Sequence, residues 1–198
     1  MSVRRILSIF EPTDVPILRK RCKPVPDFGA RTQRIVDDLL DTLAEHENSG
    51  AALAAPQIGE PWRIVVARLE RAEKPVVLVN PKIVRDRGAE TEFDGCLSIP
   101  GIYGDTARAE RIHLDAFDRH GQRTPMALQG YDARVIQHEL DHLDGVLFID
   151  RLDDLGGLYK IAGAAEAGGA RRAPVTERER ALIEAQRRSL PPYALRGR

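Results

Sequence analysis

Residues 131–143 read YDARVIQHELDHL, which is the most informative segment of the chain. Its apolar residues recur at the spacing of one helix face, and glycines stand just outside it at positions 130 and 145. A 3.6-residue period closed by glycine is typical of an amphipathic helix that buries one stripe. The sequence therefore predicts a helix over 131–143, whose apolar stripe is made by Val135, Ile136, Leu140 and Leu143.

The polar side of this helix carries His138 and His142, which stand at positions i and i+4. Residues at that spacing lie one turn apart on the same face, so both imidazoles can bind a single metal ion. Glu139 lies beside the first histidine, where a carboxylate can take a proton from metal-bound water. The alternative is a helix that carries two exposed histidines by chance, and the clear helical context argues against it.

A catalytic metal site needs a third protein ligand and an open fourth position. No histidine follows His142, and the glutamates downstream of it fall in a linker and a tail. Upstream, the segment DGCLSIP (94–100) places Cys96 after an acidic residue and a glycine, a setting that suits an exposed turn. One thiolate with two imidazoles is a tetrahedral set for Fe(II), Zn(II), Co(II) or Ni(II). The alternative for a lone cysteine is a small buried hydrophobe, which is how we interpret Cys22.

A third segment, GAALAAPQIG (50–59), is rich in small residues. Small residues let a backbone approach a ligand closely, and Gln57 offers an amide donor near the end of the run. Simple close packing is the commoner reason for such a run. This segment alone therefore predicts no site.

The remaining elements follow from hydrophobic periodicity. A second amphipathic helix is predicted over 31–46, and β-branched runs predict strands at 63–67 and 76–79. Alternating residues predict a hairpin made by 111–116 and 124–128. Helix, strands and helix follow one another without regular βαβ alternation, which favours an α+β fold with mixed or antiparallel strands around the central helix.

The end of the chain differs in composition. Residues 156–170 are rich in Gly and Ala, which is typical of a linker or a frayed helix. Thr176 begins a capping-box pattern ahead of a helix predicted over 176–189. We therefore divide the chain into a catalytic domain of residues 1–155 and a Gly/Ala-rich linker with a basic helical tail at 156–198.

The net charge of zero conceals an acidic body between two basic ends. Residues 1–34 carry 8 basic and 3 acidic side chains, residues 35–170 carry 14 and 24, and residues 171–198 carry 8 and 3. This balance excludes a nucleic-acid coat, and we expect no sequence-specific nucleic-acid binding.

The sequence also predicts the compartment. No apolar run approaches the roughly 18–20 residues that span a bilayer, and the first residues lack the apolar core and cleavage site of a signal peptide. Two cysteines do not make a disulfide framework. We therefore expect a cytoplasmic protein with no membrane partner.

Together, the three segments resemble the peptide deformylases. That family has a Gly-x-Gly-Φ-Ala-Ala-x-Gln segment, a Glu-Gly-Cys-Leu-Ser segment and a Gln-His-Glu-x-Asp-His helix, in this order. The matching residues here are 50–57, 94–98 and 137–142. The resemblance covers about residues 3–155 and leaves 156–198 outside it in any detail.

The resemblance implies a hydrolase that removes the formyl group from formyl-Met nascent peptides and releases formate. It implies one divalent metal ion per chain, Fe(II) in the cell, with Zn(II), Ni(II) or Co(II) as occupants after isolation. Its ligands would be Cys96, His138 and His142.

The same resemblance assigns roles around the metal. Glu139 would accept a proton from the attacking water and return it to the leaving amine. The side-chain amide of Gln57 and the backbone N–H of Leu97 would stabilise the oxyanion, where losing one donor typically costs about 10²–10³ in kcat.

Two positions depart from the family pattern. Asp94 stands where the family has Glu, and Ala52 stands where it has its second Gly. The family's Glu pairs with a downstream arginine, here Arg108, and the shorter Asp94 predicts a repositioned or water-bridged pair. Gly50 and Ala52 would contact the peptide substrate through the backbone. A positive φ at Ala52 would add strain of about 1 kcal/mol, and otherwise the change is harmless.

Three further residues of the helix have two interpretations each. Asp141 either orients the helix or a ligand, or is an exposed helix carboxylate with no role at the site. Tyr131 and Val135 are candidate walls of an apolar pocket for methionine, with plain core residues as the alternative.

Two other functions stay open at this point. A zinc peptidase of the His-Glu-x-x-His type is disfavoured because no ligand follows the helix. A binding module, such as a ribosome-associated relative without activity, is disfavoured by the intact metal set. Residues 171–198 contain eight arginines and are a candidate for transient ribosome contact, although a solvated basic helix is the commoner explanation.

Overall fold

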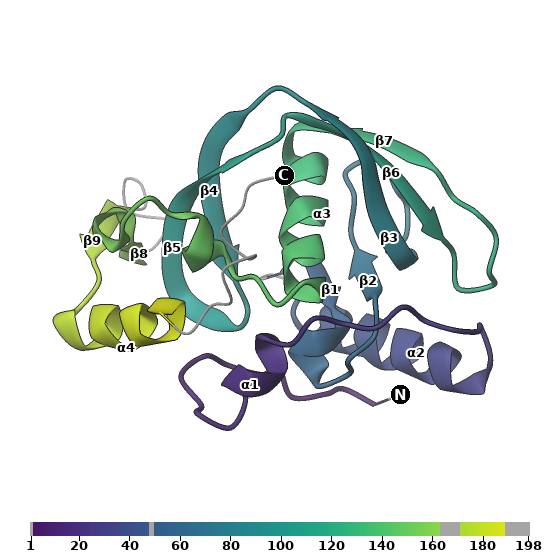
Figure 1. The fold of residues 1–198 in the computed structure, drawn as a ribbon, viewed down its shortest axis with the longest axis horizontal. Helices are drawn as coiled ribbons and strands as arrows, with labels where there is room; N and C mark the ends of the chain where they lie inside the picture. Colours follow the sequence, from purple (N-terminus) through teal and green to yellow (C-terminus); the bar gives the residue numbers. More distant parts are fainter. Residues whose placement is uncertain (1, 48–49, 163–170, 189–198) are drawn as a thin grey trace.

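The computed structural model describes residues 2–47, 50–162 and 171–188. Helix α3 (Gly130–Leu143) stands at the centre, between two antiparallel sheets (Figure 1). The five-stranded sheet has the order β1 (Ala52–Ala54), β2 (Ile64–Ala67), β3 (Val76–Arg87), β6 (Arg111–Phe117) and β7 (Met126–Gln129). The four-stranded sheet has the order β4 (Glu90–Cys96), β5 (Ile99–Arg108), β8 (Tyr159–Ala162) and β9 (Arg171–Pro174).

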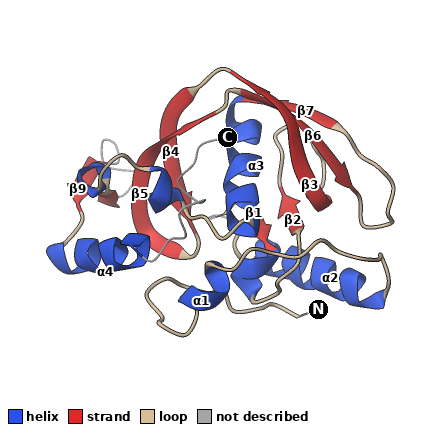
Figure 2. Ribbon diagram, viewed as in Figure 1, coloured by secondary structure: helices blue, strands red, loops and turns tan. Residues whose placement is uncertain are grey.

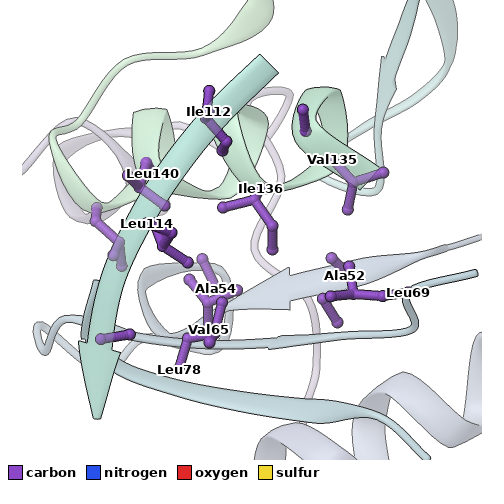
Figure 3. Packing of buried hydrophobic residues seen from close by; sticks show 14 of the residues in the cluster. Ala52, Ala54, Val65, Leu69, Leu78, Ile112, Leu114, Val135, Ile136 and Leu140 are labelled. Atoms are coloured by element: carbon purple, nitrogen blue, oxygen red, sulfur yellow. The ribbon is translucent and has the colours of Figure 1, made fainter. Parts of the chain in front are cut away.

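The five-stranded sheet packs one face against the apolar stripe of α3. In β6, Ile112, Leu114 and Ala116 alternate with more exposed residues and are almost fully buried. They share a core cluster with Ile136 and Leu140 of α3 (Figure 3). Burying a large apolar side chain contributes about 1.5–3 kcal/mol, so this contact anchors the helix to the sheet.

Helix α2 (Ala30–Glu45) covers the other face of the same sheet. Its Leu39 and Leu43 are fully buried and share a cluster with Ile64 and Val66 of β2. Since alternate residues of a strand point to opposite faces, β2 is buried along its whole length, between α2 and α3.

The four-stranded sheet encloses a second core. Its hairpin β4–β5 packs against the short helix η2 (Phe148–Arg151), where Phe148 is almost fully buried. Helix α4 (Glu177–Arg188) contacts η2 and buries Ile183 in this core. The short helices α1 (Val15–Leu18), η1 (Ala55–Ile58) and η3 (Leu155–Gly157) complete the elements of the described residues (Figure 2).

The predicted α+β fold with antiparallel sheets is confirmed. Helix α2 occupies the predicted 31–46 to within one residue at each end, and α3 begins one residue before the predicted 131–143. The strands predicted at 63–67 and 76–79 and the predicted hairpin correspond to β2, β3, β6 and β7. The hairpin β4–β5 was not predicted, because its exposed strand residues and glycines hide the alternation.

The structure corrects the prediction that residues 156–170 form a linker or a frayed helix. Residues 159–162 form β8, which pairs with β5 and β9, and Tyr159 is buried. Residues 163–170 lie outside the described part of the chain, as does residue 189 of the helix predicted over 176–189. The run LYKI (158–161) has no clear alternation of apolar and polar side chains and follows two glycines, so the sequence did not indicate this strand. The division at residue 155 stays a prediction.

No helix within the described residues is long and apolar enough to cross a membrane.

Candidate metal centre

Three side chains with metal-binding atoms meet beside α3. Cys96 ends β4, whereas His138 and His142 come from α3. One ligand atom from each residue lies within 4.8 Å of the other two, and Cys96 Sγ is 3.2 Å from His142 Nε2. Such atoms stand about 3.3–3.6 Å apart around a tetrahedral ion with the usual bond lengths. The three residues therefore fit one divalent metal ion.

A break in the β4–β5 ladder brings Cys96 to this point. Gly95 pairs with Tyr103, but Cys96 pairs with Ile99, so the register shifts between the two residues. The backbone N–H of Ser98 donates to Cys96 Sγ at 3.4 Å across the turn. This turn fixes the sulfur at the strand end that meets α3.

Asp94 orients the first histidine. Its Oδ1 lies 2.7 Å from Nδ1 of His138, and both side chains are buried. Because a carboxylate only accepts hydrogen bonds, Nδ1 carries the proton and Nε2 is left for a metal. Burial alone would raise the pKa of Asp94, but His138, the charge of Arg108 and the hydrogen bond from Thr106 hold it well below its usual range.

The second oxygen of Asp94 is fully engaged. Its Oδ2 accepts from Arg108 Nε at 2.9 Å, from Arg108 Nη2 at 2.7 Å and from Thr106 Oγ1 at 2.7 Å. The pair of Asp94 and Arg108 is thus direct. The sequence predicted a repositioned or a water-bridged pair, and the shorter side chain does not require the bridge. One carboxylate joins the histidine of α3 to the arginine of β5.

Asp141 extends this network from the other side. Its carboxylate accepts from Arg108 Nη1 at 2.8 Å and from Nε and Nη2 of Arg151. Asp141 is only 8% exposed, so the alternative of an exposed helix carboxylate is wrong. Asp94, Arg108 and Asp141 therefore form a buried chain behind His138, and the exposed Arg151 pairs with its outer end.

His142 has a different environment. Its Nδ1 is buried and has no hydrogen-bond partner among the described residues. Burial and the neighbouring His138 lower the pKa of His142 well below its usual value, so its imidazole is neutral, the form that binds a metal.

Glu139 is buried beside the first histidine. It is 4% exposed, and its Oε2 has no hydrogen-bond partner within the part of the chain that the structure describes. Burial raises the pKa of Glu139 to about 7. A carboxyl group that is poised near neutral pH and left unpaired can exchange a proton with a bound reactant.

Gln57 presents its amide nitrogen to the cysteine. The backbone N–H of Ala54 donates to Gln57 Oε1 at 2.8 Å, which fixes the orientation of the amide group. Gln57 Nε2 then lies 3.7 Å from Cys96 Sγ and 3.3 Å from Ser98 Oγ. Leu97 lies in the turn between these two residues, so its backbone belongs to the same corner of the site.

Gly50 and Ala52, in the segment 50–59, have distinct roles in packing. A Cβ at Gly50 would lie 2.8 Å from Cδ1 of Leu97, so glycine lets the two segments approach. Ala52 is extended in β1 and pairs with Ala67. Among the described non-glycine residues only Asn80 has a positive φ, so the strain considered for Ala52 does not arise.

A cavity of about 410 Å³ opens beside the three ligands. The predicted residues Gly50, Ala52, Tyr131 and Val135 line it, as do Gln57, Leu97 and Glu139. Tyr131 is 51% exposed, whereas Val135 is buried.

The cavity also has walls that the sequence did not predict, which come from Phe93, Tyr103 and Arg134. Arg134 precedes His138 by four residues, so its place on the ligand face could have been inferred from helical spacing. The two aromatic residues depend on the β4–β5 pairing, for which the sequence carried no clear signal.

The other cysteine is remote from this chemistry. Cys22 is 5% exposed, and it belongs to the apolar cluster between α3 and the five-stranded sheet. Burial raises the pKa of Cys22 to about 12. This residue is the buried hydrophobe that the sequence predicted.

Comparison with known proteins places this geometry in a family. The polypeptide deformylase family model matches residues 4–157. A peptide deformylase of Dehalococcoides mccartyi is 40% identical over 161 residues, which cover 81% of this chain and 93% of the relative. That of Alkalilimnicola ehrlichii is 45% identical over 142 residues, or 71% of this chain and 79% of the relative.

The structural comparison agrees. The crystal structure of peptide deformylase from Thermus thermophilus matches with a TM-score of 0.70 and 36% identity, and the match covers 94% of each chain. Sequence, fold and the grouping of Cys96, His138 and His142 thus lead to one assignment. The chain belongs to the polypeptide deformylase family, whose enzymes remove the formyl group from the amino terminus of nascent peptides.

Proposed function

We propose that Cys96, His138 and His142 hold one divalent metal ion, at which the chain hydrolyses the formyl group of formyl-Met peptides. The observation that carries this proposal is the grouping of three ligand atoms within 4.8 Å, beside a buried carboxyl group whose Oε2 has no partner among the described residues. A thiolate with two imidazoles suits Fe(II), which we propose for the cell, and also Zn(II), Ni(II) or Co(II). When bound, such an ion acts as a Lewis acid on the formyl oxygen and on water.

Glu139 moves the proton in this reaction. Its carboxylate accepts a proton from water as the water oxygen forms a bond to the formyl carbon. The carbon–nitrogen bond then breaks, and Glu139 returns the proton to the leaving amine. The products are formate and a peptide with a free amino terminus, so atoms and charges balance with water as the only co-reactant.

Gln57 and Leu97 stabilise the charge that develops on the formyl oxygen. Gln57 Nε2 is oriented toward the Cys96 corner by the bond from Ala54, so it costs no reorganisation during the reaction. The backbone N–H of Leu97 supplies a second donor from the turn after Cys96.

The cavity walls bind the rest of the substrate. We assign the methionine side chain to the pocket beside Val135 and Tyr131, and the peptide backbone to the segment that contains Gly50 and Ala52. Asp94, Arg108 and Asp141 touch no substrate in this scheme, and they hold His138 in place.

Formate release from formyl-Met-Ala-Ser tests the proposal, with protein loaded either with Fe(II) or with Ni(II). We expect release in both forms and none after the metal is removed by a chelator. Cys96→Ala should lose its metal on dialysis, whereas the matched substitution Cys22→Ala should keep it. The absence of release in both forms, with the metal shown to be bound, would contradict the proposal.

We also propose that the enzyme works in the cytoplasm and that residues 171–198 contact the ribosome transiently. Within the described residues, Arg180 donates to the carbonyl of Leu155 and Arg187 to that of Leu152. These two arginines attach α4 to the segment 152–155. A contact with the ribosome would therefore use other arginines, such as Arg171 and Arg178. Co-sedimentation with ribosomes that is undiminished by the double substitution Arg171→Ala and Arg178→Ala would contradict a contact through these two arginines, and co-sedimentation that survives deletion of 171–198 would contradict the role of the whole segment.

A further inference from the structure

A row of stacked side chains crosses the four-stranded sheet. The ring centroids of Phe93 and Tyr103 are 5.1 Å apart, and those of Tyr103 and Tyr159 are 6.2 Å apart. The guanidinium carbon of Arg172 lies 4.0 Å from the ring centroid of Tyr159. These residues come from β4, β5, β8 and β9 in turn, which are neighbouring strands of this sheet (Figure 1). The row therefore runs from the β4–β5 hairpin to the strand pair β8–β9, which we call the C-terminal hairpin.

The far end of this row is fixed by polar contacts. Tyr159 Oη donates to Asp105 Oδ1 at 2.9 Å, and Arg172 forms two hydrogen bonds to the same carboxylate, at 2.6 and 3.0 Å. Tyr159 is only 7% exposed. The C-terminal hairpin therefore provides a rigid support for the ring of Tyr103.

The near end of the row faces the metal centre. Phe93 and Tyr103 line the cavity, and Phe93 is 44% exposed. A Cβ at Gly95 would lie 2.6 Å from Cδ1 of Tyr103, so this ring covers the residue that precedes Cys96. A peptide that leaves the metal past β4 would have to run along these two rings.

We propose that Phe93 and Tyr103 contact the side chain of one of the first two residues after the formyl-methionine, and that Tyr159 and Arg172 are positioning residues for Tyr103. This inference rests on the proposed function. Aromatic rings gain most from aromatic and large apolar partners, so the row selects peptides with such a side chain close to the methionine. The small residues 50–52, which also line the cavity, offer no comparable contact.

Steady-state kinetics on three peptides test this selection: formyl-Met-Ala-Ser, formyl-Met-Phe-Ser and formyl-Met-Ala-Phe. In the wild-type protein, phenylalanine at one of the two positions should raise kcat/KM about two- to tenfold over alanine or serine at the same position, mainly through a lower KM. Tyr103→Ala should abolish this ratio. Arg172→Ala and Tyr159→Phe should reduce it, because the first removes the cation over Tyr159 and the second removes the bond to Asp105.

Arg85→Ala is the control, because Arg85 is an exposed arginine of β3 that belongs neither to the row nor to the cavity. It should leave the ratio unchanged, and thermal unfolding checks that every variant is folded. Equal kcat/KM for all three peptides in the wild type, or an unchanged ratio in Tyr103→Ala, would overturn the proposal. An unchanged ratio in both Arg172→Ala and Tyr159→Phe would overturn the role of the hairpin. Failure to release formate from any peptide would instead contradict the proposed function.

Discussion

The two faces of α3 contact their neighbours through different kinds of interaction. Toward the five-stranded sheet, Ile136 and Leu140 make apolar contacts (Figure 3). Toward the four-stranded sheet, Arg134, His138 and Asp141 make hydrogen bonds and ion pairs with residues of β4 and β5.

Apolar contacts are non-directional and supply most of the free energy of folding. Hydrogen bonds are directional and fix distances to within tenths of an ångström. One face of α3 therefore contributes mainly to the stability of the fold, and the other mainly to the geometry of the site. Substitutions on the two faces should therefore separate these properties.

The largest effect should come from the reactive carboxylate on the polar side. Glu139→Gln keeps the size of the side chain but cannot accept the proton, so kcat/KM should fall about 10²–10⁴-fold. The metal content should stay that of the wild type, because Glu139 is not among the grouped ligands. Metal analysis together with formate release checks both points, and near-normal turnover would contradict the role of Glu139.

A substitution on the apolar face should lower stability and leave the activity of the folded protein nearly unchanged. Ile136 is fully buried, so Ile136→Ala should lower the free energy of unfolding by about 2–5 kcal/mol, as measured by urea denaturation. The folded variant should keep its activity within a few-fold. Ile161→Ala is the control, since Ile161 is 45% exposed and its loss should have little effect on stability. A large loss of activity in folded Ile136→Ala would contradict the separation of stability and site geometry between the two faces.

Loss of the hydrogen bond between Asp94 and His138 should have an intermediate effect, on metal affinity. In Asp94→Asn the carboxylate that orients the imidazole is gone, and metal affinity should fall about 10–100-fold in competition with a chelator. Asp144→Asn is a matched control, because Asp144 pairs with Arg63 at 2.8 Å but does not line the cavity. Equal metal affinity in both variants would show that the buried charges serve stability alone.

The smallest effect concerns pH. Burial raises the pKa of Glu139 to about 7 when no metal is bound, and a nearby cation favours the charged form and lowers it. Because the base must be deprotonated, kcat/KM should decline as the pH falls, with an acidic limb below pH 7. The residual activity of Glu139→Gln should lack this limb. A limb of the same shape in that variant would assign it to another group.

The sequence could predict the features that lie within one continuous run of residues, but not those that join separate elements. The apolar stripe of α3 and both histidines lie in one continuous run, so the helix and two ligands were predictable from spacing. The contacts of Asp141 with Arg108 and Arg151 join three separate elements, and only the folded chain shows that this carboxylate is buried.

The missed elements share one physical cause. Strands β4, β5 and β8 expose much of one face and contain or follow glycines, so their alternation is weak. Tyr103 and Tyr159 become neighbours only when β8 pairs with β5. Residues that shape the cavity through sheet pairing were therefore beyond the reach of local patterns.

The contrast between the two cysteines gives the protein a built-in occupancy reporter. Cys22 is buried with its pKa raised to about 12, so it stays in the unreactive thiol form. Cys96 lines the cavity, where an alkylating reagent can reach its sulfur unless an ion is bound to it. The fraction of chains that gain one alkyl group in a mass spectrum would then equal the fraction without metal, which allows each preparation to be scored before its activity is measured.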